Sequence, residues 1–454
     1  MKRAVLLCCA LMGCLPAFSQ EELTLEVLLS LSEANNPSLV NAHYSVLGAQ
    51  AQRREARWEY FPKASVSGFG YQAIRPLIKI TPRDVLGNSD QAHVLDEQMT
   101  AAAQEYGIKP YYSGFKYGYG AGLTAIQPLY AGGRILSGNK LAELGVQSAE
   151  IQERMTRRAV RDSVESKYWQ IVALQEKQRT LEQASVLLDE LEKELRSAVE
   201  AGVATETDLL RLQLRQRELQ AGKYRLDGSI GLLKMDLFDQ VGYSYRYIDL
   251  PSIRLSDTLD ELAAPEYWMD EEAEAGRSDE SRLLQMRVDA GKLEKQMAAG
   301  ELRPQVAVGA GYGYSGFQQA AKGKFNGWVG ATVQIPLTDI GKAVERSRRY
   351  EYQIRQAETD RDYLESRLEL QIKMLRLEME TAWKELEVAR DAAAIAERTF
   401  VQMQHAFEAG RCTSGELLQA EWEQISAQEE LIKCKIAYKT AINSYLCTIN
   451  SHQS

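Results

Sequence analysis

The segment Gln305-Val-Ala-Val-Gly-Ala-Gly-Tyr-Gly-Tyr314 decides the fold, because its side chains alternate between two kinds. Every second position carries an apolar or aromatic side chain, namely Val306, Val308, Ala310, Tyr312 and Tyr314. The positions between them are small and include the glycines at 309, 311 and 313. A period of two is typical of a β-strand with two different faces. It does not match G-x-G-x-x-G, the pattern of a phosphate-binding loop that opens a helix.

Three other segments share this alternation, so the sequence predicts four strands. They cover residues 64–73, 117–127, 305–314 and 328–335. One face of each strand is bulky and apolar, and the other is small or polar. Two interpretations fit this pattern. The sheet is either buried by helices, as in a soluble protein, or made of tilted transmembrane strands of about 9–11 residues with tyrosines near their ends.

The four strands belong to two copies of one repeating unit. Landmark residues have equal spacing in both copies: Pro37–Pro62 matches Asp279–Pro304 in length, and Pro128–Gly202 matches Pro336–Gly410. Equivalent residues of the two copies are farther apart in the sequence for the first pair of segments than for the second pair. The first copy therefore has the longer loop between its two segments. We predict a first repeat over 20–237, a linker over 238–264 and a second repeat over 265–454. Alternating tyrosines at 243, 245 and 247 suggest a small strand or collar in the linker.

Very long helices follow the strands in both copies. In the second copy, apolar residues step by four and three without a break: Leu368, Ile372, Leu375, Met379, Ala382, Leu386, Ala389, Ala393, Ala396, Phe400, Met403 and Phe407. Leucines at 174, 181, 188 and 195 repeat by seven in the first copy. This is the heptad pattern of a coiled coil. The segment from Gly133 to Glu200 would extend ~100 Å as a helix, which is too long for a compact core.

Each long helix is expected to turn back at a helical hairpin tip. Gly202 and Gly410 are suited to the left-handed position that ends a helix. Thr205 or Thr207 in the first copy, and Thr413 or Ser414 in the second, can cap the next helix.

Four strands cannot form a closed membrane barrel in one chain. An open sheet edge in a bilayer leaves backbone N–H and C=O groups unpaired, at a cost of several kcal/mol each. Small closed barrels need about eight strands, and an eight-stranded barrel fills its interior with bulky side chains. Because the small face here is Gly, Ser and Thr, we expect three chains and a wider lumen. The predicted fold is a mixed α+β membrane protein, with four transmembrane β-strands per chain completing a 12-stranded trimeric β-barrel and very long coiled-coil helices forming an α-barrel.

The chain resembles the TolC-like outer-membrane efflux proteins. The resemblance rests on Thr24-Leu25-Glu26 with Asn35-Asn36-Pro37, on the strand exits at 127–134 and 335–342, and on the two tips. It implies a homotrimeric outer-membrane duct of a Gram-negative bacterium, with a periplasmic α-barrel. It also implies a periplasmic adaptor, docked at the tips, and an inner-membrane pump of the RND or ABC type. The tip residues are Gly202, Val203, Ala204, Thr205, Gly410 and Thr413.

The resemblance implies a closable entrance at the tips, and the chain matches its pattern only in part. The family's gate uses an Asp on the first hairpin and a Tyr and an Arg on the second. Asp208 occupies the Asp position, whereas Phe407 and Cys412 replace the Tyr and the Arg, with Arg411 as the candidate substitute for the missing cation. A gate role for Asp208 competes with an ordinary role for an acid near a helix N-terminus.

A second tip feature implied by the resemblance is a carboxylate ring inside the pore. Glu416 matches that ring, whereas Gln419 replaces its second acidic position. Three copies of Glu416 would attract cations and bind divalent metal weakly. The alternative is again an acid that stabilises the start of a helix.

The N-terminal segment over residues 1–19 has the composition of a secretory signal peptide. Lys2 and Arg3 precede an apolar stretch over residues 4–15, and cleavage after Ser19 is expected. Lipidation at Cys14 is the alternative. Without this segment three cysteines remain, Cys412, Cys434 and Cys447, which are too far apart on one helix to bridge one another and are expected to be small buried residues.

Composition narrows the classes of function. The net charge of −9 argues against nucleic-acid binding, and no cofactor, metal or catalytic motif stands out, so we expect no enzyme.

The segment Arg75–Lys116 is predicted to be a long exterior loop, and residues 315–327 a short one. Trp58, Tyr60 and Phe61 fit either a membrane interface or a core. The leading function is a passive exit duct, and the alternative is a non-conducting, outer-membrane-anchored coiled-coil scaffold.

Overall fold

The structure is a computed structural model that describes residues 23–75, 77–107, 112–114, 116–202, 204–244, 253–255, 257, 259, 262–269, 278–317, 322–336 and 340–449. The expected signal peptide, Cys14 and Val203 lie outside the described residues. The chain forms two compact units. One comprises Met1–Ala49, Val146–Arg287 and Gln356–Ser454, and the other comprises Gln50–Gly145 and Val288–Arg355. Below they are called the helical unit and the sheet unit.

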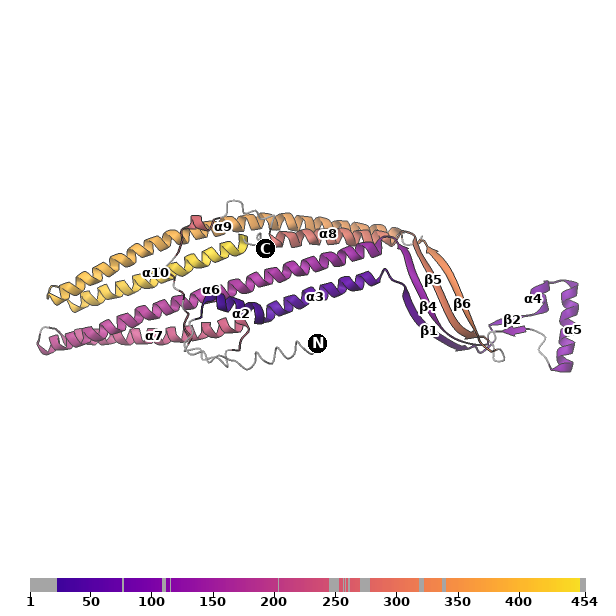
Figure 1. Cartoon of the computed structure of the whole chain (residues 1–454), viewed down its shortest axis with the longest axis horizontal. Coiled ribbons are helices and arrows are strands. Elements are labelled where there is room, and N and C mark those ends of the chain that lie inside the picture. Colours follow the sequence, from indigo (N-terminus) through magenta and orange to yellow (C-terminus); the bar gives the residue numbers. More distant parts are fainter. Residues whose placement is uncertain are drawn as a thin grey trace. The chain divides into compact units, whose positions relative to one another are not determined.

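The predicted long helices are present in both copies (Figure 1). The helices are α2 (Leu25–Asn35), α3 (Pro37–Trp58), α6 (Arg134–Glu200), α7 (Glu206–Val241), α8 (Asp279–Gly300), α9 (Ile340–Glu408) and α10 (Ser414–Ile449), with a short 3₁₀ turn η3 (Pro265–Tyr267). Helix α7 continues past the predicted end of the first repeat, because Gly242 supplies the left-handed residue that ends it.

The predicted heptad seam is the core of the helical unit. Met379 and Leu386 of α9 are fully buried against Tyr438, Ile442 and Tyr445 of α10. In the first copy, Leu188 and Leu195 of α6 are equally buried. The periodicity therefore predicted both the helices and the face that each helix buries.

The two copies repeat their helix-start chemistry at equivalent positions. Asn36 begins α3, and its Oδ1 accepts the Ser38 N–H at 2.8 Å. The equivalent Ser278 begins α8, and its Oγ accepts the Ser281 N–H at 3.0 Å. Both capping residues are buried. Asp279, next to Ser278, is buried too and pairs with Arg154 at 2.8 Å and with Arg158, which ties α8 to α6.

The described part of the linker packs on the helical unit. Leu255 forms a parallel β-bridge with Leu23, and the Ile253 carbonyl accepts a hydrogen bond from the buried Lys234 Nζ at 2.6 Å. The Tyr168 hydroxyl donates to the Asp257 carboxylate at 2.6 Å. Tyr245 and Tyr247, on which the predicted collar partly rests, lie outside the described residues.

The sheet unit contains the four predicted strands, side by side in Figure 1. They are β1 (Lys63–Gln72), β4 (Tyr117–Ala131), β5 (Gln305–Gly316) and β6 (Lys324–Gln334), in the order β1-β4-β5-β6, with every pair antiparallel. Two strand ends differ from prediction by four residues, and the other ends agree to within two residues. Strand β6 begins earlier than predicted, at Lys324, because Lys324 to Gly327 pair with Tyr312 to Ser315. Strand β4 continues to Ala131 through an irregular register between Pro128 and Tyr130.

The prediction of a long loop over Arg75–Lys116 is wrong in part. This segment contains β2 (Ile78–Ile80), α4 (Pro82–Leu86), α5 (Asp90–Tyr106) and β3 (Tyr112–Gly114), with β2 and β3 paired antiparallel. The Ser89 hydroxyl caps α5 by accepting the Ala92 N–H at 3.3 Å, and Gly107 ends it at a φ of 66°. The residues between Ser89 and Gly107 have high helix propensity, so they form a helix although the turn residues around them favour a loop.

Candidate functional site

The two faces of the sheet differ as predicted. The antiparallel register places Val66, Leu123, Tyr312 and Val329 on the apolar face. Val66 is 80% exposed and Val329 is 87% exposed, so the described helices of the sheet unit itself do not cover this face. Within this unit, the exposure favours the transmembrane interpretation over a sheet buried by helices. None of the described helices combines the length and apolar character that a membrane-crossing helix requires.

The opposite face is small and hollowed. A concave surface of about 290 Å³ is lined by side chains of this face, among them Ser67, Thr124, Ser315 and Asn326, over a floor of glycines. Beside the hollow, Ser65 Oγ and Thr124 Oγ1 are hydrogen-bonded across β1 and β4 at 2.9 Å. Small and polar side chains therefore border a shallow hollow on this face.

Aromatic rings interrupt this small face, which the sequence pattern did not reveal. Phe69 pairs with Gly120 and Trp328 pairs with Gly311 across neighbouring strands. A Cβ on Gly120 would lie 2.8 Å from the Phe69 ring, and a Cβ on Gly311 would lie 2.5 Å from Trp328 Nε1. These glycines thus leave space for rings that lie flat on the sheet. The prediction that this face is small or polar is corrected at these two positions, because the strand register decides which ring pairs with a glycine.

Aromatic side chains also mark both ends of the apolar strands. At the β5–β6 end, Tyr312 stacks on Phe325 with ring centres 5.7 Å apart, and Tyr314 lies 5.0 Å from the same ring. Before β1, the rings of Trp58 and Phe61 are 5.1 Å apart. Trp58 is 69% exposed, so the described chain favours the interface interpretation of this group over the core interpretation. Girdles of this kind flank the apolar band of membrane strands.

The two edges of the sheet are open. Strands β1 and β6 each pair on one side only within the described residues. They are ten and eleven residues long, which exceeds the short length with which soluble proteins protect their edges.

Both predicted hairpin tips are present, with matching local chemistry at equivalent positions of the two copies. At the first tip, the Thr205 hydroxyl accepts the Asp208 N–H at 3.3 Å, and Asp208 Oδ2 accepts the Thr205 N–H at 3.2 Å. At the second, Thr413 and Glu416 exchange the same two bonds at 3.3 and 2.8 Å. These are capping boxes, so Thr205 and Thr413 are the caps, rather than Thr207 and Ser414.

The glycines close the preceding helices. Gly202 and Gly410 have φ values of 75° and 67°. The Gly410 N–H bonds to the Phe407 carbonyl at 2.9 Å, and the Arg411 N–H bonds to the Ala406 carbonyl at 2.8 Å. This is a Schellman motif, which requires the left-handed residue that glycine supplies most easily.

The two candidate carboxylates are held in their charged forms. The hydroxyl and N–H of Thr205 lower the pKa of Asp208, and the Ser414 hydroxyl of the other hairpin adds to this effect. The N–H and hydroxyl of Thr413 lower the pKa of Glu416, which is exposed. Each acid therefore caps a helix and also keeps a negative charge at a tip.

The other gate candidates lie in different environments. Phe407 packs against a cluster of buried residues near the tips, called here the tip cluster: Leu191, Leu195, Leu212, Phe400, Leu417 and Ala420. Arg411 is exposed, and Cys412 is half-buried with its Sγ 3.4 Å from the Met403 carbonyl oxygen. Burial raises the pKa of the Cys412 thiol. All three cysteines predicted to be unbridged are free.

Comparison with known proteins decides the family. The family model of the outer membrane efflux protein matches residues 28–229 and 282–444, one segment for each copy of the repeat. The chain belongs to the outer membrane efflux protein family. A search of curated protein sequences finds no match.

Solved structures share the fold of this efflux protein over nearly its whole length. The outer membrane protein VceC of Vibrio cholerae has a TM-score of 0.74 at 16% identity, covering 94% of this chain and 95% of its own. The CmeC outer membrane channel of Campylobacter jejuni has a TM-score of 0.74 at 13% identity, covering 94% and 86%. The open state of the MtrE outer membrane channel of Neisseria gonorrhoeae has a TM-score of 0.71 at 12% identity, covering 94% and 89%.

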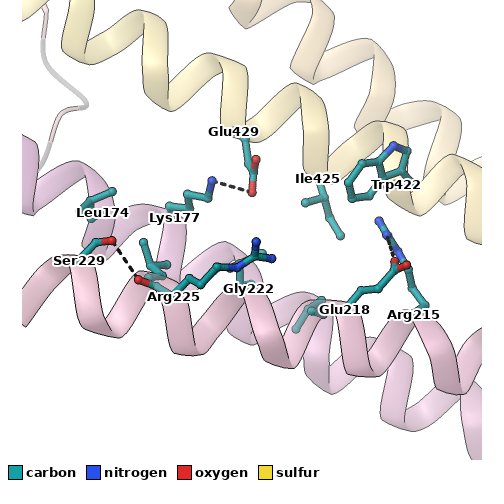
Figure 2. A pocket seen from close by; sticks show the side chains of 13 residues that line it. Leu174, Lys177, Arg215, Glu218, Gly222, Arg225, Ser229, Trp422, Ile425 and Glu429 are labelled. Carbon is teal, nitrogen blue, oxygen red and sulfur yellow. Dashed lines mark hydrogen bonds and ion pairs between the residues drawn. The ribbon is translucent and has the colours of Figure 1, made fainter.

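The helical unit of the efflux protein also holds a groove that sequence reasoning missed (Figure 2). It has a volume of about 590 Å³ and lies between α6 and α7 on one side and α10 on the other. Lys177 of α6 faces Glu429 of α10 at 3.1 Å, and the Arg215 guanidinium lies 3.7 Å from the Trp422 ring centre. Gly222 contributes no side chain to its floor. The groove arises between helices far apart in sequence, so periodicity alone could not indicate it.

Proposed function

We propose that this outer membrane efflux protein is the exit duct of a tripartite efflux or secretion system. Three copies form the duct, which conducts substrate passively while a partner supplies the energy. The observation that carries the proposal is the exposed four-stranded sheet with two open edges. In a bilayer those edges must pair, and the available partners of the right length are β1 and β6 of further copies.

The character of the small face supports three copies rather than two. Two copies would give eight strands, whose interior bulky side chains normally fill. Here the concave face is mostly Gly, Ser, Thr and Asn, and rings such as that of Trp328 lie against glycines instead of projecting as a plug. Twelve strands around a polar lumen fit this surface better.

The tips are the proposed contact for a periplasmic adaptor, which would join the duct to an inner-membrane pump of the RND or ABC type. Their turns expose Gly202 and Gly410, and Ala204 beside the first turn is half-buried. The groove beside Trp422 and Arg215 offers a further polar and apolar surface along α6, α7 and α10. Cysteine-specific crosslinking from Ala204→Cys to a co-expressed adaptor tests this contact. A label on the sheet unit at Ser67→Cys is the matched negative control.

The duct itself is tested with the purified full-length protein. Light scattering in detergent should give three times the chain mass, and planar bilayers should show stepwise, ohmic conductance without any energy source. A stable folded monomer would contradict the trimer. Stable trimers that neither conduct nor pass a small dye would instead support the non-conducting scaffold.

A further inference from the structure

Glu421 is a buried acid in the helical unit that no part of the proposed duct uses. It lies on α10 in the seam that this helix buries, one turn from Leu417 and one turn from Ile425, which are both buried. The residue is only 2% exposed. A glutamate at such a position replaces the apolar side chain that a heptad seam normally requires.

The Glu421 carboxyl group has no hydrogen-bond partner among the residues that the structure describes. Neither Oε1 nor Oε2 of Glu421 accepts a hydrogen bond from any described residue. The side chain instead lines a small cavity of about 40 Å³ together with Phe400 and Phe407 of α9 and Leu191 of α6. This cavity adjoins the tip cluster, in which α6 and α7 of the first hairpin meet α9 and α10 of the second. The carboxyl therefore sits in the contact between the two hairpins.

The charged groups around Glu421 are mainly acidic. Helix α6 contributes Glu190 and Glu194 to the same cavity, and α9 contributes Glu408. His405 of α9 lies 3.5 Å from Glu408. No group of three or more acidic, His or Cys side chains among the described residues has the geometry to hold a metal ion.

Helix α7 contributes Arg215, a nearby cation that favours ionisation of Glu421. That guanidinium is already bonded to Glu218 at 2.8 Å and stacked on Trp422 (Figure 2). Burial outweighs this cation and raises the pKa of Glu421 to about 7.

We propose that the Glu421 carboxyl is a proton-binding site in the contact between the two hairpins: it holds a proton while they are packed and releases it when they separate near the tips. Burying a neutral acid costs far less than burying a carboxylate without a partner. Separation exposes the group to water, where it ionises. A rise in pH therefore favours the separated hairpins.

The sign and the range of this linkage follow from the two pKa values. In the separated state the pKa returns to about 4.5, whereas in the packed state it is about 7. Between these values the packed state binds more protons, so the equilibrium constant for separation rises about tenfold for each pH unit. Below and above this range it is flat. A role of this site in gating conduction rests on the proposed exit duct. The proton-linked separation of the hairpins does not depend on that proposal.

Hydrogen exchange in the full-length protein tests the site. Peptides covering residues 187–198 of α6 and 414–425 of α10 are followed by mass spectrometry, with rates corrected for the intrinsic pH dependence of exchange. The protection factors should fall about 15-fold between pH 5.5 and pH 7 and stay nearly constant from pH 7.5 to 8.5. Glu421→Gln should abolish this slope. Glu423→Gln, which alters an exposed neighbour on the same helix, should retain it.

Three outcomes would overturn the inference: no slope in the unmodified protein, a slope that survives Glu421→Gln, or a slope lost in Glu423→Gln. A slope caused by His405 would survive Glu421→Gln and is thereby recognised. If Glu421→Gln fails to fold, Glu421→Leu supplies the same comparison. Trimers that conduct but lack the pH dependence of protection would contradict this inference and leave the exit duct intact. A protein that shows the pH dependence but does not conduct would contradict the exit duct and leave this inference intact.

Discussion

At the scale of single residues, Glu416 combines two roles that substitutions can separate. Its carboxylate caps α10 and is exposed at the second tip. In a trimer the three carboxylates would form a ring that attracts cations. Glu416→Gln removes the charge but keeps an oxygen that can accept the Thr413 N–H. We expect the reversal potential in a KCl gradient to shift from a cation-selective value toward zero.

Thr413→Ala is the complementary control for Glu416, because it removes the cap and keeps the charge. It should leave the reversal potential unchanged. If Glu416→Gln also leaves the reversal potential unchanged, the carboxylate does not face the conducting path and its role is capping alone.

At the scale of elements, the two capping boxes stabilise the helices that leave the tips. Thr205→Ala and Thr413→Ala should each lower local stability by about 1 kcal/mol, measured as faster hydrogen exchange in the first turns of α7 and α10. Thr207→Ala is the matched control, because the structure gives the cap to Thr205. A loss of protection in Thr207→Ala equal to that in Thr205→Ala would contradict the assignment.

The caps should also depend on pH, with a sign opposite to that of Glu421. Hydrogen bonds to the carboxylates lower the pKa of Asp208 and of Glu416. The stability that the charged carboxylates add to the helix starts is therefore complete above the ordinary carboxyl pKa. It is lost as the pH falls through the lowered pKa values. Protection of the first turns of α7 and α10 should decrease in acid, and Asp208→Asn should remove this decrease at the first tip only.

The elements show how far sequence reasoning extends. Alternation predicted the strands and heptads predicted the buried faces, because both are local periodicities. The start of β6 at Lys324 was missed because pairing with β5 decides it, and the ring of Trp328 over Gly311 depends on the same register. Helix α5 has local signals in its caps Ser89 and Gly107, but the prediction of a loop gave more weight to the turn residues around this segment.

The candidate sites were only partly predictable for a related reason. The family resemblance indicated Asp208 and Glu416 for two different roles, and the structure gives both the same capping bond. Phe407 was considered as a gate residue, whereas it packs beside the tip cluster. Glu421 lies three residues after Leu418 and four before Ile425 in the seven-residue series that continues to Ile432, and a charge at that seam spacing was the available signal. The burial of Glu421 depends on Phe400 and Leu191, which are distant from it in the sequence.

At the scale of the whole molecule, the decisive question is which face of the sheet meets lipid. Val329 and Thr332 lie close together on β6 and on opposite faces. An arginine on a lipid-facing strand position near the bilayer centre costs about 2–4 kcal/mol, whereas one on a lumen face meets water. In the proposed trimer, the cost at Val329 would be incurred three times. We expect Val329→Arg to abolish heat-resistant trimers in outer-membrane extracts and Thr332→Arg to preserve them with lower cation conductance. Equal tolerance of both substitutions, or the reverse pattern, would contradict an apolar face in lipid and a small face around the lumen.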